Sequence, residues 1–180
     1  MPTIKLHDLE FVPYIDNEEI EKAIDKVSTR INADFKGTED IPVLVCVLNG
    51  SIMFTAELMK RLDFTCELAS IRSSSYDGTK STGKAQTVIG LTTDIRDRRV
   101  IIVEDIIDTG ITIASLFNSF REMGAKEIKI CTMLLKSEVY KGELKPDYVA
   151  MEVKPEFLVG FGLDYNQIGR NLKDIYILKK

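Results

Sequence analysis

Apolar residues recur along this chain with two different periods, and the alternation of these periods predicts the order of its strands and helices. Near-continuous apolar runs, such as IPVLVCVLNG, RRVIIVEDII and IKICTMLL, are typical of strands buried on both faces of a sheet. Shorter apolar runs in the last third of the chain predict further strands. The predicted strands are 41–50, 64–72, 98–107, 128–135, 147–153, 157–162 and 175–180.

Segments with helical spacing of apolar residues separate the first strands. Asp16 or Asn17 is the expected N-cap of the first helix, Ser51 is expected to cap the second, and Gly124 is expected to end the third. Because strands and helices alternate in the middle of the chain, we expect an α/β fold with a central parallel sheet and right-handed crossovers. The short strands near the end suggest a small hood on that sheet. The predicted helices are 17–33, 52–62 and a segment ending near Met123.

Length and composition favour one domain. At 180 residues and 44% hydrophobic content, the chain can fill one core but not two. We expect a core over about 37–145, with the hood built from about 1–16 and 146–180. The net charge of −4 argues against a protein that coats nucleic acid, which would carry a basic excess.

Several kinds of site are excluded by residue counts. His7 is the only histidine, so a multi-histidine metal site cannot form, and any metal should be a hard cation held by carboxylates. Cys46, Cys66 and Cys131 lie in apolar runs and read as buried, reduced thiols. No apolar stretch reaches the roughly 20 residues of a membrane span, and MPTIKLHDLE lacks a signal-peptide profile. We therefore expect a cytoplasmic protein with no membrane partner.

The segment VIIVEDIIDTGIT (100–112) holds the most informative polar cluster. Its three acids would repel one another, and a cation or a ligand rich in hydroxyl donors would relieve that repulsion. The glycine and the start of the following helix favour an anion, so the pattern describes a ribose phosphate site. The alternative is a polar turn with Asp108 or Thr109 as an ordinary cap. The position at the end of a central strand favours function. The polar residues are Glu104, Asp105, Asp108, Thr109, Gly110 and Thr112.

A second glycine-rich segment is a decoy. GTKSTGK (78–84) fits the first seven positions of a P-loop, but Ala85 stands where Ser or Thr should hold magnesium. A strand is expected after it, where a P-loop needs a helix. We interpret 73–84 as a long polar loop of the kind that often has a function.

Further motifs make the chain resemble the hypoxanthine phosphoribosyltransferases, the 6-oxopurine salvage branch of the type I phosphoribosyltransferase family. VIIVEDIIDTGIT is similar to the family's motif for 5-phosphoribosyl 1-pyrophosphate (PRPP). LNGS at 48–51, SSSY at 73–76, the lysine after strand 128–135, KPDYVAMEV and FLVGFGLDYNQIGRNL also match. The resemblance implies the type I phosphoribosyltransferase fold. It also implies transfer of the phosphoribosyl group to N9 of hypoxanthine or guanine, giving IMP or GMP and pyrophosphate.

The resemblance implies roles around the ribose phosphate. Residues 108–112 would hold the 5′-phosphate, and Glu104 and Asp105 would face the ribose hydroxyls and, through water, Mg²⁺. Asp108 would take or share the proton at purine N7. Arg170 would meet the pyrophosphate.

The purine has its own implied contacts. Lys136, which alone reads as a solvated strand end, would donate to O6, and Phe157 would stack on the base. The backbone at Leu158 and Asp164 would read the other purine edge, and the Asp164 carboxylate would bind a second Mg²⁺. The residues of the loop that would close over the transition state are Ser75 and Tyr76.

Two positions depart from the family pattern. The early loop reads Leu48-Asn49-Gly50, where the family often has Leu-Lys-Gly, so a role of that lysine side chain is in doubt. Backbone contacts of this loop to pyrophosphate could persist, with a cis peptide as one option. Ile111 stands where some members carry lysine, and backbone N–H donation survives that change.

Two alternatives stay open at this point. One is a phosphoribosyltransferase for another base, such as adenine or xanthine. The other is a PRPP-sensing regulator that binds nucleic acid, for which the net charge of −4 leaves little room. The family resemblance further implies a homodimer or homotetramer, and it leaves the preference among hypoxanthine, guanine and xanthine open.

Overall fold

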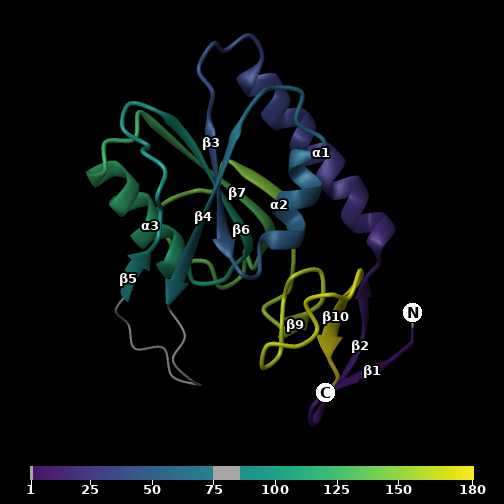
Figure 1. Cartoon of the computed structure of the whole chain (residues 1–180). Helices are drawn as coiled ribbons and strands as arrows, with labels where there is room; N and C mark the ends of the chain where they lie inside the picture. Colours follow the sequence, from purple (N-terminus) through teal and green to yellow (C-terminus); the bar gives the residue numbers. More distant parts are fainter. Residues whose placement is uncertain (1, 75–85) are drawn as a thin grey trace.

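The computed structural model describes the backbone of residues 2–74 and 86–180 and contains two sheets (Figure 1). The larger sheet has the strand order β5-β4-β3-β6-β7-β8, parallel except for β5. The α/β class with a central parallel sheet is confirmed. The strands of this sheet are β3 (Val43–Leu48), β4 (Glu67–Ser74), β5 (Gln86–Ile89), β6 (Arg99–Ile107), β7 (Glu127–Leu135) and β8 (Tyr148–Glu152).

Side-chain alternation along the central strands builds two hydrophobic layers. In β3, Leu44 joins the layer under α1 (Asn17–Phe35) and α2 (Ile52–Met59), whereas Val43 and Val45 join the layer under α3 (Ile111–Glu122). All three side chains are fully buried. Burial on both faces explains why these strands read as continuous apolar runs. None of the helices in the described residues is long and apolar enough to cross a membrane.

The helix ends follow the expected chemistry with one exception. Asp16 accepts a hydrogen bond from the Glu19 amide at 2.9 Å and caps α1. Gly124 follows α3 with a φ of 86°, the left-handed conformation that glycine adopts without strain. Ser51 is the N-cap residue of α2 as predicted, but its side chain makes no cap bond, because its hydroxyl donates to the Val47 carbonyl at 2.8 Å.

The hood is the second sheet, in the order β1-β2-β10-β9, with antiparallel pairs throughout. Its N-terminal hairpin was not predicted as strands, and the predicted strand over 157–162 shrinks to two residues because glycines with positive φ follow it. The tail joins the hood later than residue 146, because β8 pairs with β7 in the core sheet. The hood strands are β1 (Ile4–Leu6), β2 (Leu9–Ile15), β9 (Leu158–Val159) and β10 (Ile175–Leu178).

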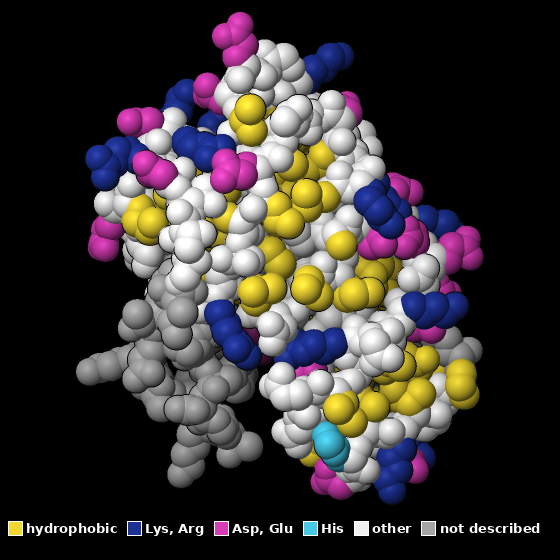
Figure 2. Space-filling view, in the orientation of Figure 1, with side chains coloured by type: hydrophobic (Ala, Val, Ile, Leu, Met, Phe, Trp, Pro, Cys, Tyr) yellow, Lys and Arg dark blue, Asp and Glu magenta, His cyan; other side chains and the backbone are white. Residues whose placement is uncertain are grey.

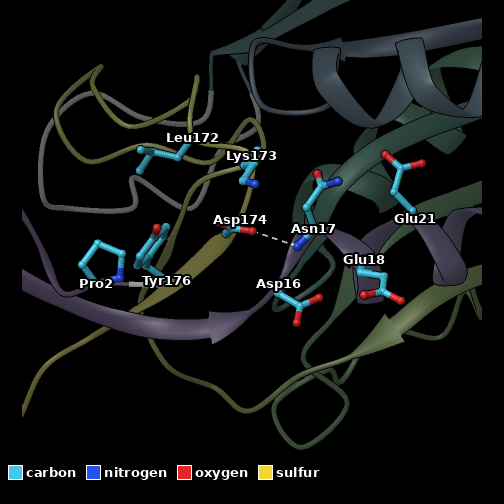
Figure 3. A pocket seen from close by; sticks show the side chains of 9 residues that line it. All are labelled: Pro2, Asp16, Asn17, Glu18, Glu21, Leu172, Lys173, Asp174 and Tyr176. Carbon is cyan, nitrogen blue, oxygen red and sulfur yellow. Dashed lines mark hydrogen bonds between the residues drawn. The ribbon is translucent and has the colours of Figure 1, made fainter.

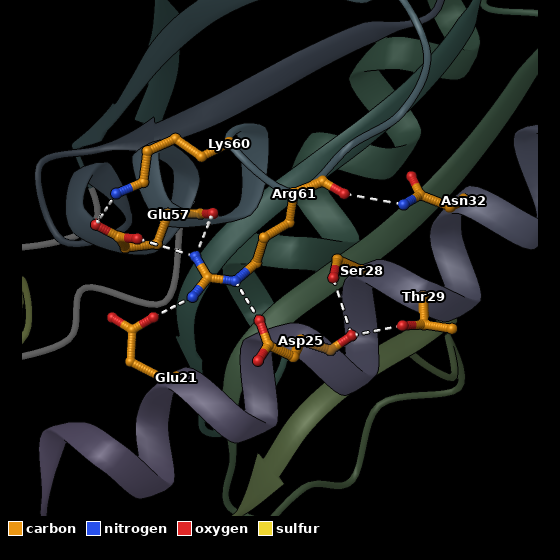
Figure 4. Close-up of polar contacts among 8 residues, drawn as sticks. All are labelled: Glu21, Asp25, Ser28, Thr29, Asn32, Glu57, Lys60 and Arg61. Atoms are coloured by element: carbon orange, nitrogen blue, oxygen red, sulfur yellow. Dashed lines mark hydrogen bonds and ion pairs between the residues drawn. The ribbon is translucent and has the colours of Figure 1, made fainter.

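A cluster of charged side chains ties α1 to the end of α2 (Figure 4). The Arg61 guanidinium pairs with Glu21, with Asp25 at 2.5 Å and with Glu57 at 2.9 Å. The Arg61 carbonyl also accepts a bond from the Asn32 amide at 2.9 Å. Because the Arg61 side chain is only 20% exposed, these pairs are better shielded than ordinary surface pairs.

Candidate active site

The carboxyl ends of β3, β6 and β7 point toward the hood, so the loops that follow these three strands meet in one region (Figure 1). Ligands of open α/β sheets bind at this edge. Figure 2 shows basic side chains gathered where the core meets the hood. The predicted site residues in the described chain come from these loops and from the facing segment 157–170.

The turn after β6 is built for an anion rather than for a side-chain cap. Gly110 is the N-cap of α3 and has a φ of 86°, a conformation that favours glycine. Asp108 and Thr109 are exposed and precede the cap, so the alternative in which either one caps the helix is not supported. The first amides of α3 lack carbonyl partners within the helix, which leaves them for a ligand. Ile111 is half exposed beside them.

Two adjacent acids lie just before this turn. Glu104 is 6% exposed, and burial, followed by repulsion from Asp105, raises the pKa of its carboxyl well above the ordinary value. Burial also raises the pKa of Asp105 to about 6, against the hydrogen bond that its carboxylate accepts from the Ile106 amide at 2.8 Å. The nearby Arg170 lowers that pKa and Asp164 raises it. A site that forces buried carboxylates together favours a positively charged ligand.

The loop after β3 passes directly over Asp105. The Leu48–Asn49 peptide is cis. Gly50 is buried, and a methyl group on its Cα would lie 1.5 Å from Oδ2 of Asp105. Only glycine therefore fits between this loop and the acid. From the other side, a methyl group on Gly162 would lie 2.0 Å from the Gly50 carbonyl oxygen, so the hood touches the same loop.

In the hood, Asp164 and Arg170 pair with each other. Their side chains form an ion pair at 2.6 Å, and a second guanidinium nitrogen donates to the Gly162 carbonyl at 2.8 Å. The other carboxylate oxygen of Asp164 accepts from the Gln167 amide at 2.8 Å. No local pattern in the sequence predicts this pairing, which joins two residues with separate predicted roles.

Lys136 reaches back from β7 to the turn after β6. Its Nζ lies 2.8 Å from Oδ2 of Asp108, and its amide donates to the Ile107 carbonyl at 3.0 Å. The Lys136 side chain is 13% exposed and that of Asp108 is 50% exposed. A donor and an acceptor are thus held side by side at the edge of the turn after β6.

Phe157 is available for stacking. It is 42% exposed, and its ring meets those of Phe11 at 6.0 Å and Tyr165 at 5.9 Å between centroids. Leu158 is buried in β9, paired with Ile177. At 42% exposure, Phe157 is not a core residue, and part of its side chain is open to solvent.

The acids fit magnesium bound together with a ligand. No group of three or more potential metal ligands occurs among residues 2–74 and 86–180. Magnesium is commonly held by one or two carboxylates plus waters and substrate phosphates, which the buried pair Glu104 and Asp105 can satisfy. Asp164 also fits, because its carboxylate lies near enough to raise the pKa of Asp105.

Some predictions fall outside the described residues. Ser75, Tyr76 and the decoy segment 78–84 are among these, and the closing loop stays a prediction. A separate hollow of about 800 Å³ lies between α1 and the hood (Figure 3). Asp174 accepts from the Asn17 amide there at 2.8 Å, and none of the predicted site residues lines it.

Comparison with known proteins was made with both sequence and structure. Residues 14–166 match the phosphoribosyl transferase domain family. The hypoxanthine-guanine phosphoribosyltransferase of Bacillus subtilis (strain 168) is 38% identical over 174 residues, which cover 96% of this chain and 95% of the relative. That of Streptococcus pneumoniae (strain R6) is 41% identical over 92% of each chain. A hypoxanthine phosphoribosyltransferase structure from Staphylococcus aureus has a TM-score of 0.85 at 34% identity, over 93% of this chain and 91% of that chain.

Proposed function

The chain belongs to the phosphoribosyl transferase family, and we propose that it is a purine salvage enzyme acting on hypoxanthine and guanine. It transfers the 5-phosphoribosyl group of PRPP to N9 of the base and releases IMP or GMP and pyrophosphate. The observation that carries this proposal is the pair of Lys136 and Asp108, held 2.8 Å apart beside an open helix start. The pair can contact a purine base, and the adjacent helix start can bind a phosphate, so the arrangement suits a purine nucleotide.

The backbone of residues 108–112 binds the 5′-phosphate. The left-handed Gly110 and the free amides of α3 supply donors, and the helix dipole favours the negative charge. Thr109 and Thr112 add hydroxyl donors. This role is compatible with Ile111, because amides rather than a lysine side chain hold the anion.

Asp108 and Lys136 handle the base. Asp108 takes or shares the proton of N7 as N9 attacks C1′, and Lys136 donates to O6. Phe157 stacks on the purine with its open side, while the backbone at Leu158 and Asp164 reads the other edge. When the purine enters, the lysine exchanges one acceptor for another and stays satisfied.

Glu104 and Asp105 are proposed to face the ribose hydroxyls and, through water, Mg²⁺, whereas the Asp164 carboxylate is proposed to bind a second Mg²⁺. When bound, Mg²⁺ neutralises the pyrophosphate as a leaving group. The cis peptide and amides of Leu48, Asn49 and Gly50 meet the pyrophosphate, joined by Arg170 from the hood. Asn49 offers a neutral side chain there, so binding relies on the backbone and Arg170.

We also propose that the enzyme acts in the cytoplasm as a homodimer or homotetramer. Ile52 and Leu68 are each about half exposed, at 51% and 52%. Ala69 and Ile71 are buried in the layer under α3, so alternation turns Leu68 toward the α2 side. Figure 2 shows hydrophobic side chains between β4 and α2. Light scattering should give two or four chains, and Leu68→Glu should shift the mass toward one chain.

The direct test is product formation from PRPP and Mg²⁺ with hypoxanthine, guanine, xanthine and adenine in turn. Turnover of hypoxanthine and guanine is expected. A preference for adenine would replace the proposal with a different base specificity. Turnover of none, together with retention of RNA or duplex DNA on a filter at physiological salt, would favour the regulator.

A further inference from the structure

Tyr140 connects the phosphate-binding turn to the lysine after β7. A methyl group built on Gly110 would lie 2.5 Å from Cε2 of Tyr140, so the ring packs directly against the Gly110 Cα. The Tyr140 amide donates to the Lys136 carbonyl at 3.0 Å. Tyr140 thus contacts Gly110 with its side chain and Lys136 with its backbone.

These contacts close a ring of interactions around the site. The Lys136 amide donates to the Ile107 carbonyl at 3.0 Å, and Gly110 follows Ile107 by three positions along the chain. Two backbone hydrogen bonds thus connect Ile107 to Lys136 and Lys136 to Tyr140, and the Tyr140 ring contacts Gly110. The Tyr140 ring therefore links the backbone at Gly110 to the backbone at Lys136, so that a shift of Gly110 has to displace the tyrosine.

The tyrosine itself is held from its far end. Its hydroxyl donates to the Leu144 carbonyl, and a methyl group on Gly142 would lie 2.5 Å from Oη. The ring also packs against the hydrophobic layer under α3. A rigid aromatic fixed at both ends can support the turn that it touches.

We propose that Tyr140 is a positioning residue that holds the phosphate-binding turn at Gly110 in register with Lys136. The proposal rests on the proposed function, in which this turn binds the 5′-phosphate. The Tyr140 ring acts through its contact with Gly110. Removing the ring should weaken ligands that carry the phosphate more than the free base, because Lys136 keeps its bond to the Ile107 carbonyl and its ion pair with Asp108.

The first test compares Tyr140→Leu, which removes the ring edge, with Tyr140→Phe, which keeps it. For Tyr140→Leu we expect the KM for PRPP to rise about tenfold, while the KM for hypoxanthine at saturating PRPP changes less than about threefold. Tyr140→Phe should restore most of the PRPP affinity. A PRPP KM within twofold of the wild type in Tyr140→Leu would overturn the proposal, as would equal effects on both substrates.

A second variant keeps the tyrosine and displaces it. Gly142 is exposed, and Gly142→Ala pushes a methyl group against the Tyr140 hydroxyl. We expect Gly142→Ala to raise the KM for PRPP by less than Tyr140→Leu does. This rise should disappear when Gly142→Ala is combined with Tyr140→Leu, because the effects of coupled sites are non-additive. Glu143→Ala, on the next exposed residue, is the matched control and should have no effect. If Gly142→Ala raised the KM for PRPP by the same factor in the wild type and in Tyr140→Leu, the proposal would be contradicted.

Calorimetry with ribose 5-phosphate separates this inference from the proposed function. If the wild type lacks transferase activity but binds ribose 5-phosphate, and Tyr140→Leu weakens that binding, the function fails and the positioning role stands. If the wild type is active and Tyr140→Leu binds ribose 5-phosphate as the wild type does, the positioning role fails. Equal thermal midpoints of Tyr140→Leu and the wild type would exclude general unfolding as the cause.

Discussion

Nζ of Lys136 lies 2.8 Å from Oδ2 of Asp108, although the two residues are 28 positions apart in the sequence. The lysine is mostly buried and the aspartate half exposed, so the ammonium is the member of the pair that most needs a partner. A purine carbonyl would offer that partner and free the carboxylate for N7. The pair therefore links recognition of the base to the chemistry performed on it.

Asp108→Asn tests the proton transfer at N7. The amide keeps the shape of the side chain but cannot accept the proton, so we expect kcat to fall by about 10²- to 10⁴-fold. The KM for PRPP should change less, because backbone amides hold the phosphate. Steady-state kinetics with hypoxanthine checks both values. Wild-type turnover in this variant would remove Asp108 from the chemistry.

Asp105→Asn tests whether the acidic pair destabilises the free enzyme. The folded-state pKa of about 6 lies above the ordinary 3.8, so the folded state holds its proton more tightly and stability falls as the pH rises from about 4 to 6. Above pH 6, the variant should be more stable than the wild type by roughly 1–3 kcal/mol, and the gain should vanish below about pH 4. Urea denaturation across this pH range measures the difference. Asp63→Asn, at an exposed acid, is the control, and an equal gain there would contradict the assignment.

Much of this site follows from local patterns in the sequence. The strand over 98–107 ends in polar residues, and position alone puts Glu104 and Asp105 at the edge where ligands bind. Within the site, glycine marks Gly50 and Gly110 as positions where the backbone meets a side chain too closely for a Cβ. These features depend on neighbours in the chain, which is why the sequence predicts them.

Other features depend on contacts across the fold, and no local pattern reports them. The pairing of Asp164 with Arg170 arises from a loop with several positive φ angles, and the packing of Tyr140 on Gly110 joins two loops of different strands. The hairpin of β1 and β2 was missed because β1 has only three residues and β2 contains Pro13, which is unusual in a strand.

Gly50→Ala tests the close approach of the 48–50 loop to Asp105. The added methyl group would lie 1.5 Å from the carboxylate, so the loop or the acid must move. We expect kcat/KM for PRPP to fall at least about 100-fold, because displacements near 1 Å carry such costs in active sites. Gly37→Ala is the control: its φ of 71° strains the backbone but no neighbour lies within 4 Å. That control should lower stability and leave the kinetics intact, whereas kinetics unchanged in Gly50→Ala would refute the close approach.

Arg61→Met tests the ion cluster between α1 and α2. Removing the guanidinium leaves the partly shielded Glu21 and Glu57, and the more exposed Asp25, without their shared cation. We expect the free energy of unfolding to fall by about 1–2 kcal/mol, with KM and kcat unchanged. Lys22→Met breaks the well-exposed pair with Glu18 and should leave the free energy of unfolding almost unchanged. Equal losses in the two variants, measured by urea denaturation, would show that shielding adds nothing at Arg61.

Lys136→Ala tests base selectivity. An ammonium offers only donors, so it suits the exocyclic oxygen of hypoxanthine or guanine and opposes the amine that adenine presents at the same position. A mostly buried donor left without an acceptor is costly, and its charge raises that cost, so the wild type should favour hypoxanthine over adenine by about 100-fold or more. The variant should lose most of its turnover of hypoxanthine and guanine, while any residual activity with adenine changes little. The ratio of hypoxanthine turnover to adenine turnover should therefore fall. Competition assays with both bases at one PRPP concentration measure that ratio directly. An unchanged ratio in Lys136→Ala would mean that another group reads O6, and Lys136 would then serve only to hold Asp108.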